Sequence, residues 1–259
     1  MIALTRRPAC SLVNCEVGYV PREGIDLPSA FRQHVAYCQA LRQMGVDVEV
    51  LPPEEAFPDS VFIEDNAIIL DELAVVTSMG TPSRQGEPAL LFPVLARHRR
   101  LVTISPPATI EGGDVLRMGK RLYVGVSTRT NRAGVAALRE IAEPLGYEVT
   151  PIGTRACLHL KTACTSLDDE TLLVNPVWLD VEALGSCRLL PVPAEEPFGA
   201  NVLCAHGEVL VQASCPLTCA LIEAHGYGAT RVDLGEFSKA DAGLTCLSLL
   251  IPPQSLPPV

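Results

Sequence analysis

The sequence lacks two features that would each point to a particular class of protein. It has no excess of basic residues, because 20 Lys and Arg stand against 30 Asp and Glu and the formal net charge is −10. Sequence-independent nucleic-acid binding needs a basic surface that neutralises phosphates, so we expect no nucleic-acid partner. The sequence also has no apolar run near the roughly 20 residues that span a bilayer, so we expect no membrane contact.

Signals of export are missing as well. The first ten residues, MIALTRRPAC, place their basic side chains after the apolar ones and contain no h-region. The ten cysteines are scattered through apolar segments of a 259-residue chain, whereas disulfide frameworks are typical of short secreted domains. We therefore expect a cytoplasmic protein with reduced, mostly buried thiols.

A metal site at Cys215, Cys219 and His225 is the alternative use of these thiols. No second ligand pair with matching spacing is present, and cysteines four apart lie on one face of a helix. We therefore favour a helix there and expect no metal.

One arrangement recurs along the chain at a spacing of roughly 40–50 residues, which is typical of repeat architectures. Each unit is a hairpin of two short apolar strands, then a helix, then a further strand. Tight turns rich in Asp and Gly mark the hairpins. The predicted hairpins span 66–78, 114–127, 163–176 and 201–213, and the predicted helices span 86–98, 131–146 and 217–225.

A fifth unit forms only if the two ends of the chain are combined. Its predicted parts are the strands 1–7, 46–53 and 244–252 and the helix 29–45, with Ser29 as N-cap. Such closure makes residues 1–259 a single α/β domain of five ββαβ-type repeats around a pseudo-fivefold axis. The Pro-rich segment 252–259 is expected to form a loose tail.

The chemically active side chains gather at the junctions just before the hairpins. If the units are related by rotation about one axis, these junctions converge on it. The side chains that would then share one pocket are Asp59, Glu64, Asp65, Glu111, Asp114, His159 and Cys246.

A cysteine nucleophile needs a thiolate and a positioned proton carrier, which Cys246 and His159 can supply. Several carboxylates would raise the pKa of the thiol and so disfavour the thiolate. A cationic substrate would balance their charge and stabilise the thiolate. A planar guanidinium fits, because its N–H edges suit carboxylates. Each residue also has a structural alternative. Cys246 could be a packed core cysteine, and His159 could be a histidine within a strand. The "EGGD" stretch could be a plain acidic turn, and Arg84 and Arg129 could lie on the surface.

Seven motifs together resemble a known family: FPDSVFIED, PSRQGE, EGGDVL, GVSTRTNRAG, LHLKT, ANVL and DAGLTCLSL. They stand in the order found in dimethylarginine dimethylaminohydrolases, members of the guanidine-modifying superfamily, and cover nearly the whole chain. The resemblance implies the family's fold, the five-bladed α/β propeller called the pentein. This fold agrees with the number of repeats counted above.

The resemblance also implies a mechanism. Cys246 would be the nucleophile, His159 the general acid and base, and Glu111 the carboxylate beside it. The reaction would hydrolyse asymmetric dimethylarginine or monomethylarginine to citrulline and dimethylamine or methylamine, through a covalent thiouronium intermediate on Cys246. No metal and no organic cofactor would be required.

The implied substrate is a small cationic guanidino amino acid, bound along its whole length. Asp65 would contact the guanidinium, Asp59 the amino end, and Phe62 would form an apolar wall. Arg84 and Arg129 would hold the α-carboxylate. The resemblance further suggests a homodimer.

Two features bear on the choice within the superfamily, and one is the chain length, because deiminases carry an inserted helical domain. Arginine deiminases typically have an Asp where Lys161 follows the "HL" pair, so room for N-methyl groups is expected here. The loop 11–24 and Cys164 depart from the family pattern. The alternatives are an arginine deiminase-like hydrolase of another guanidino compound and a catalytically inactive propeller that serves as a binding protein.

Overall fold

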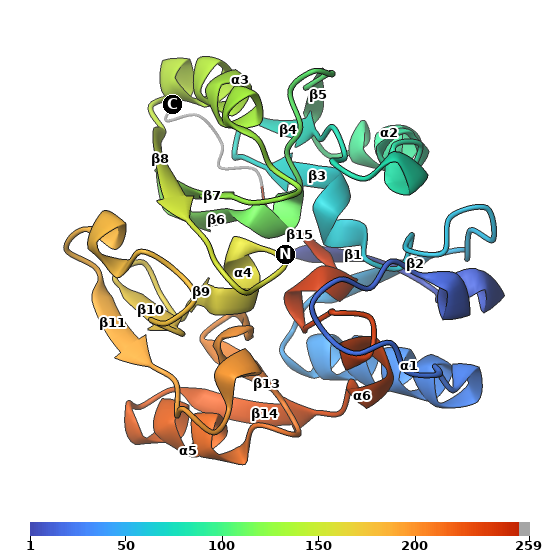
Figure 1. Cartoon of the computed structure of the whole chain (residues 1–259), viewed down its shortest axis with the longest axis vertical. Helices are drawn as coiled ribbons and strands as arrows, with labels where there is room; N and C mark the ends of the chain where they lie inside the picture. The colour runs from blue at the N-terminus through green and yellow to red at the C-terminus, as the bar shows by residue number, and fades with distance from the viewer. Residues whose placement is uncertain (254–259) are drawn as a thin grey trace.

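The structure is a computed structural model and describes residues 1–253. Five three-stranded sheets stand as blades around a central axis (Figure 1). In four blades the chain forms an antiparallel hairpin and then returns to add a third strand parallel to the second. The predicted α/β propeller of five repeats is confirmed; the tail residues 254–259 lie outside the described residues.

Four blades follow the order of the chain. Their strands are β3 (Ala67–Ile69), β4 (Leu73–Val76) and β5 (Arg100–Thr103); β6 (Val115–Met118), β7 (Arg121–Val126) and β8 (Glu148–Gly153); β9 (Cys164–Ser166), β10 (Thr171–Val174) and β11 (Arg188–Pro191); and β12 (Leu203–Ala205), β13 (Glu208–Gln212) and β14 (Gly228–Val232). In the fifth blade, β1 (Ile2–Arg6) lies between β15 (Leu249–Ile251) and β2 (Asp47–Leu51). Figure 1 shows β1 and β15 side by side near the axis.

The hairpins turn where the sequence predicts. At the tip of β12–β13, His206 and Gly207 both have positive φ, as the two central residues of a type I′ turn require. Gly119, between β6 and β7, has a φ of 57°, which a side chain would strain.

The helices are α1 (Leu27–Gln43), α2 (Phe92–Leu95), α3 (Arg132–Ala142), α4 (Leu160–Ala163), α5 (Pro216–Ala224) and α6 (Gly235–Ser238). The N-cap predicted at Ser29 is wrong, because α1 begins earlier. Asp26 is the N-cap and accepts a hydrogen bond from the Ser29 backbone N–H, and Pro28 suits the first turn. The helix predicted over 86–98 shortens to a 3₁₀ turn, η4 (Pro88–Leu91), followed by α2.

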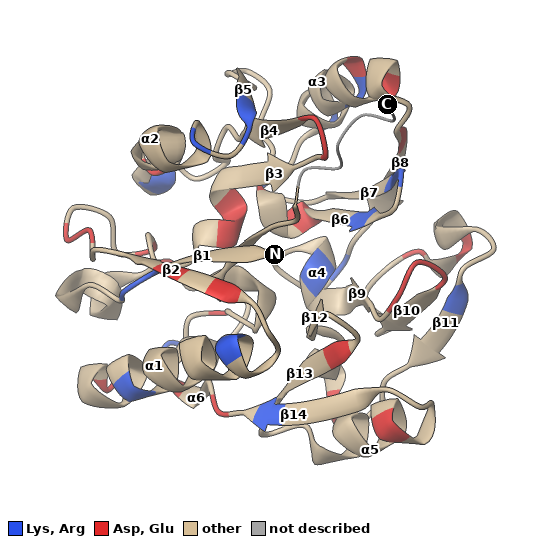
Figure 2. Cartoon of the chain, turned by 180° about the vertical axis from the view of Figure 1, so that it is seen from behind, with Lys and Arg blue, Asp and Glu red and all other residues tan. Residues whose placement is uncertain are grey.

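A short turn precedes one edge strand of each blade. These turns are η2 (Ile63–Asn66) before β3, η5 (Gly112–Asp114) before β6, α4 before β9, η8 (Pro197–Ala200) before β12 and η9 (Thr245–Leu247) before β15. The turn η2 contacts both η5 and η9, and α4 contacts both η5 and η8. Seen from behind, acidic stretches of ribbon lie near the centre between β1 and β3, close to the basic stretch of α4 (Figure 2).

Apolar clusters fill the space around these turns. One, for example, joins α1 to the β12–β14 blade, and another joins the β3–β5 and β6–β8 blades. Within residues 1–253, the helices fall short of the length and hydropathy needed to cross a membrane. All ten cysteines lie in this range and are free thiols.

Candidate active site

A histidine–glutamate pair lies at the centre of the propeller. His159 directly precedes α4 and Glu111 directly precedes η5, and His159 Nε2 lies 2.8 Å from Glu111 Oε2. Both side chains are buried. Burial alone would lower the pKa of His159, but Asp65, Asp114 and Glu111 outweigh it and raise the pKa to about 9.

Asp65 approaches the same histidine from η2. Its Oδ1 lies 3.8 Å from His159 Nδ1 and accepts a hydrogen bond from the Gly113 backbone N–H at 3.1 Å. A Cβ on Gly113 would come within 2.7 Å of both side chains, and one on Gly112 would come within 2.0 Å of the Glu64 carbonyl oxygen. The "EGGD" stretch is therefore a close-packed junction, since both glycines are needed for two blades to meet.

Cys246 is the middle residue of η9, and the extended chain that leads into β15 begins at Ser248. The Cys246 sulfur accepts a hydrogen bond from the Gly243 backbone N–H at 3.4 Å, and the residue as a whole is half-buried. Burial, followed by the charges of Glu64 and Asp65, raises the pKa of the Cys246 thiol to about 12. Without a bound cation the thiol is therefore protonated at neutral pH.

Arg84 is buried and is fully engaged within the protein. Its Nη1 donates to Asp65 Oδ2 at 2.8 Å, and its Nε and Nη2 donate to the two carboxylate oxygens of Glu87. Only 2% of the residue is exposed, so the alternative of a surface arginine is wrong. In this structure Arg84 holds Asp65 in place, and its predicted contact with a substrate carboxylate stays a prediction.

Arg129 has a different environment. Its Nη1 lies 3.5 Å from Glu111 Oε2, yet this buried nitrogen makes no hydrogen bond with any residue of the described chain. The other oxygen of Glu111 accepts from the Gly80 backbone N–H at 3.0 Å. Arg129 therefore retains a donor for a ligand beside the His159–Glu111 pair.

The segment 11–24 connects two carboxylates at the site. The Glu16 backbone N–H donates to both oxygens of Asp59 at 3.2 Å. The Gly18 and Tyr19 backbone N–H groups donate to Asp241 Oδ2 at 2.6 and 3.0 Å. Asp241, which sequence reasoning missed as a site residue, has a φ of 57° and lies two residues before Gly243, whose N–H contacts the Cys246 sulfur.

Three further side chains complete the account. Phe62 packs edge-on against Phe237, with ring centroids 6.5 Å apart, and lines the apolar cluster that contacts Cys246. Asp114 is fully buried and accepts hydrogen bonds from Ser127 Oγ and from the backbone N–H that follows His159. Cys164 is fully buried among apolar side chains, so it packs in a core.

Comparison with known proteins decides the family. A family model described as eukaryotic N,N-dimethylarginine dimethylhydrolase matches residues 22–171. The N(G),N(G)-dimethylarginine dimethylaminohydrolase of Streptomyces coelicolor is 40% identical over 249 residues, which is 95% of this chain and 95% of that protein. The chain belongs to this family. Its identification from ordered motifs is confirmed, and the protein is a hydrolase.

Solved structures of dimethylarginine dimethylaminohydrolases superpose closely on the chain. One, from Pseudomonas aeruginosa, is a cysteine-to-serine variant in complex with citrulline; it gives a TM-score of 0.91 at 33% identity, over 95% of this chain and 97% of that one. Another, a histidine-to-glycine variant as an adduct with S-methyl-L-thiocitrulline, gives the same TM-score and identity over 95% and 98%.

One group of side chains in this hydrolase is close enough to hold a metal ion. Among residues 1–253, Asp65, Glu111 and His159 offer ligand atoms within 4.8 Å of one another. These side chains already hydrogen-bond to one another, to Arg84 or to backbone N–H groups. Hydrogen bonding within the chain therefore accounts for their positions.

The raised pKa of His159 should make the stability of this hydrolase depend on pH. The folded pKa of His159, about 9, lies above its ordinary value of roughly 6.5, so the interactions of protonated His159 with Asp65, Asp114 and Glu111 stabilise the fold fully below pH 6.5. This contribution is lost as pH rises through 9, by up to roughly 1.4 kcal/mol per pH unit. Urea unfolding between pH 6 and 10 should show this loss in the wild-type chain. His159→Gln should lack it, and equal slopes in the two proteins would contradict the raised pKa.

Proposed function

We propose that this protein hydrolyses N-methylated arginine to citrulline and a methylamine. The observation that supports this most is the convergence of an acid–base pair, a thiol turn and buried carboxylates within a fold whose relatives bind citrulline and an arginine analogue. The carboxylates suit a guanidinium, because its planar N–H edges pair with them.

Substrate binding would activate the nucleophile. Burial and nearby carboxylates hold the Cys246 thiol protonated, and a guanidinium placed beside Asp65 offsets part of that negative charge, so the thiol loses its proton to solvent. The thiolate then attacks the central carbon of the guanidinium and forms a carbon–sulfur bond. Coupling ionisation to binding keeps the thiol unreactive when the site is empty.

His159 would move the proton in both halves of the reaction. Its raised pKa leaves it protonated at neutral pH, so it can protonate the departing methylamine as the carbon–nitrogen bond breaks. The neutral imidazole then takes a proton from water, which attacks the thiouronium carbon. Citrulline leaves, and the Cys246 sulfur is free again. Glu111 would orient the imidazole through the 2.8 Å contact.

The amino-acid end of the substrate would be held at the other end of the candidate active site. Asp59 would bind the α-ammonium group of the substrate in place of its hydrogen bond with the Glu16 N–H. Arg129 has an unused donor for the α-carboxylate of the substrate. Lys161 pairs with Glu64 and leaves no acidic side chain at its position to select an unsubstituted guanidinium. The absence of an acidic side chain at position 161 favours methylated arginine over arginine.

A substrate panel tests the proposal. The protein is incubated with asymmetric dimethylarginine, monomethylarginine, arginine and agmatine, and the ureido product is measured. We expect the two methylated arginines to give the highest kcat/KM, with agmatine poor because it has no carboxylate for Arg129. Faster turnover of arginine would indicate a deiminase, and no turnover by the folded protein would indicate a binding protein.

A further inference from the structure

A network of four side chains supports the turn that holds Cys246, and the mechanism above gives this network no part in positioning the thiol. Lys161 Nζ donates to Glu64 Oε1 at 2.7 Å, and Thr245 Oγ1 donates to Glu64 Oε2 at 2.7 Å. Asn201 Nδ2 donates to Thr245 Oγ1 at 3.0 Å and to the Lys161 carbonyl oxygen at 2.8 Å. The four residues close a circle of hydrogen bonds that joins four of the five blades.

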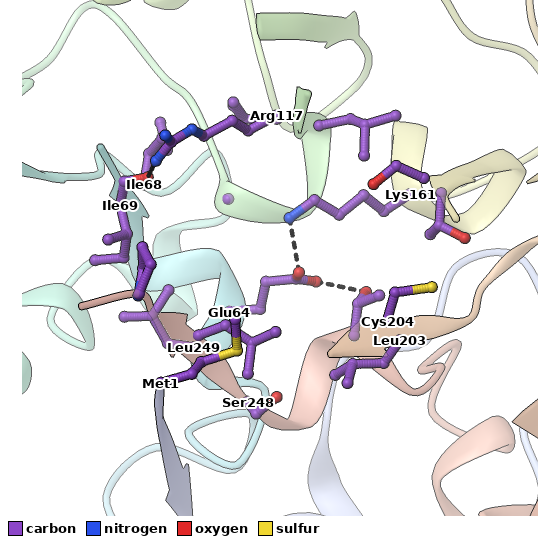
Figure 3. Close-up of a pocket in the computed structure, with 18 of the residues that line it drawn as sticks. Met1, Glu64, Ile68, Ile69, Arg117, Lys161, Leu203, Cys204, Ser248 and Leu249 are labelled. Carbon is purple, nitrogen blue, oxygen red and sulfur yellow. Dashed lines mark hydrogen bonds and ion pairs between the residues drawn. The ribbon is translucent and has the colours of Figure 1, made fainter. Parts of the chain in front are cut away.

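A cavity of about 530 Å³ lies on one side of this network. Figure 3 shows Lys161 extended across it, with its ammonium directed at Glu64. Both residues line the cavity, whereas neither Cys246 nor His159 does. Because the exposed Asp169 also lines it, the cavity reaches the surface. The Lys161–Glu64 pair therefore forms a wall between this cavity and the reacting groups.

The pair also balances a charge next to the nucleophile. Only 7% of Glu64 is exposed, and a buried carboxylate without a partner is costly. The charged side chains that act on Cys246 are Glu64 and Asp65, which disfavour its thiolate, and Lys161, which favours it. The Lys161–Glu64 pair thus affects both the position of the Cys246 turn and the charge around its thiol.

We propose that Lys161 and Glu64 form a charge-balanced positioning pair, which fixes the Cys246 turn through Thr245 and shields the thiolate from the buried carboxylate. Lys161 is thus a positioning residue that acts through Glu64. The kinetic part of this inference rests on the proposed function, whereas the reactivity of the thiol does not.

Charge-changing variants separate this role from ordinary packing. Lys161→Met should lower kcat/KM for dimethylarginine by roughly 10- to 100-fold, mainly in kcat, because the thiolate loses its neighbouring cation. The double variant K161M/E64Q restores neutrality and should recover most of this loss. Lys120→Met, at an exposed lysine paired with Glu72, is the matched control and should keep wild-type constants. A double variant no better than K161M, with both proteins folded, would overturn the proposal.

Chemical rescue tests the same residue through the cavity. Lys161→Ala removes three methylenes and the ammonium, which together correspond to n-propylammonium. Adding this ion should restore a large part of the lost kcat, while n-propanol, of similar shape but uncharged, should not. Equal rescue by the alcohol would show that space filling, not charge, is what Lys161 supplies.

Thiol reactivity gives a readout that needs no substrate. We measure iodoacetamide alkylation of Cys246 at pH 7.5 by peptide mass spectrometry. K161M should slow it and Glu64→Gln should accelerate it, because removing a cation and removing an anion shift the thiolate in opposite directions. Slower alkylation in both variants would reject the proposal. If methylated arginine is not turned over, the two variants should still change the alkylation rate in opposite directions. Failure of the proposed function can therefore be distinguished from failure of this inference.

Discussion

A Cys246→Ser variant should turn over dimethylarginine at least about 10⁴-fold more slowly than the wild-type chain. The hydroxyl has a far higher pKa than the thiol, so even a bound guanidinium cannot generate a useful alkoxide in its place. The surrounding turn should stay intact, because the Gly243 N–H can donate to oxygen as it does to sulfur. Citrulline release with saturating substrate measures the loss.

Two controls make this result specific to the site. Cys10→Ser changes an exposed cysteine and should keep wild-type turnover. C246S itself should still bind substrate, which calorimetry can detect. If C246S kept more than about one-tenth of the wild-type kcat, the thiol could not be the nucleophile, since a positioned thiolate cannot be replaced at so small a cost.

Arg84→Met should lower the free energy of unfolding by about 3–5 kcal/mol. The guanidinium lies between Asp65 and Glu87, and its removal leaves two buried carboxylates without their partner. Chemical denaturation monitored by circular dichroism measures the change. Arg129→Met is the matched comparison and should cost much less, because Arg129 is more exposed and makes one longer ion pair.

The comparison of these two arginines also separates their roles toward a substrate. If Arg84→Met proved no less stable than Arg129→Met, Arg84 would not be held by the buried network. It would then be free for the carboxylate contact that the family resemblance implies. A large stability loss for Arg84 alone would instead assign it to the support of Asp65.

Local sequence signals were enough to predict the blades. A hairpin needs only alternating apolar residues and a turn that tolerates positive φ. A pair of neighbouring residues such as His206-Gly207 is enough to indicate such a turn. The stretch 86–98 was harder because Pro88 and Pro93 interrupt the backbone hydrogen bonds of a continuous helix. There the chain forms two short turns instead of one helix.

The site was predictable only in part. Repeat symmetry indicated that the acids, His159 and Cys246 would converge, because it fixes where equivalent junctions lie. Symmetry does not tell which partner each side chain takes, so the burial of Arg84 against Glu87 was not foreseen. The tether from Asp241 to the segment 11–24 joins residues more than 220 positions apart, which no local pattern encodes.

The pairing of β1 with β15 has a consequence for how the protein is made. Ile2 and Ile251 are neighbours in one sheet, so β1 must wait during synthesis until β15 has been made. The other four blades can form from contiguous sequence in order of synthesis, whereas this one must close a loop of almost the whole chain. Because η9 leads directly into β15, the thiol reaches its place only when that final blade closes. Reactivity therefore arises late, after the acids and His159 already have their places.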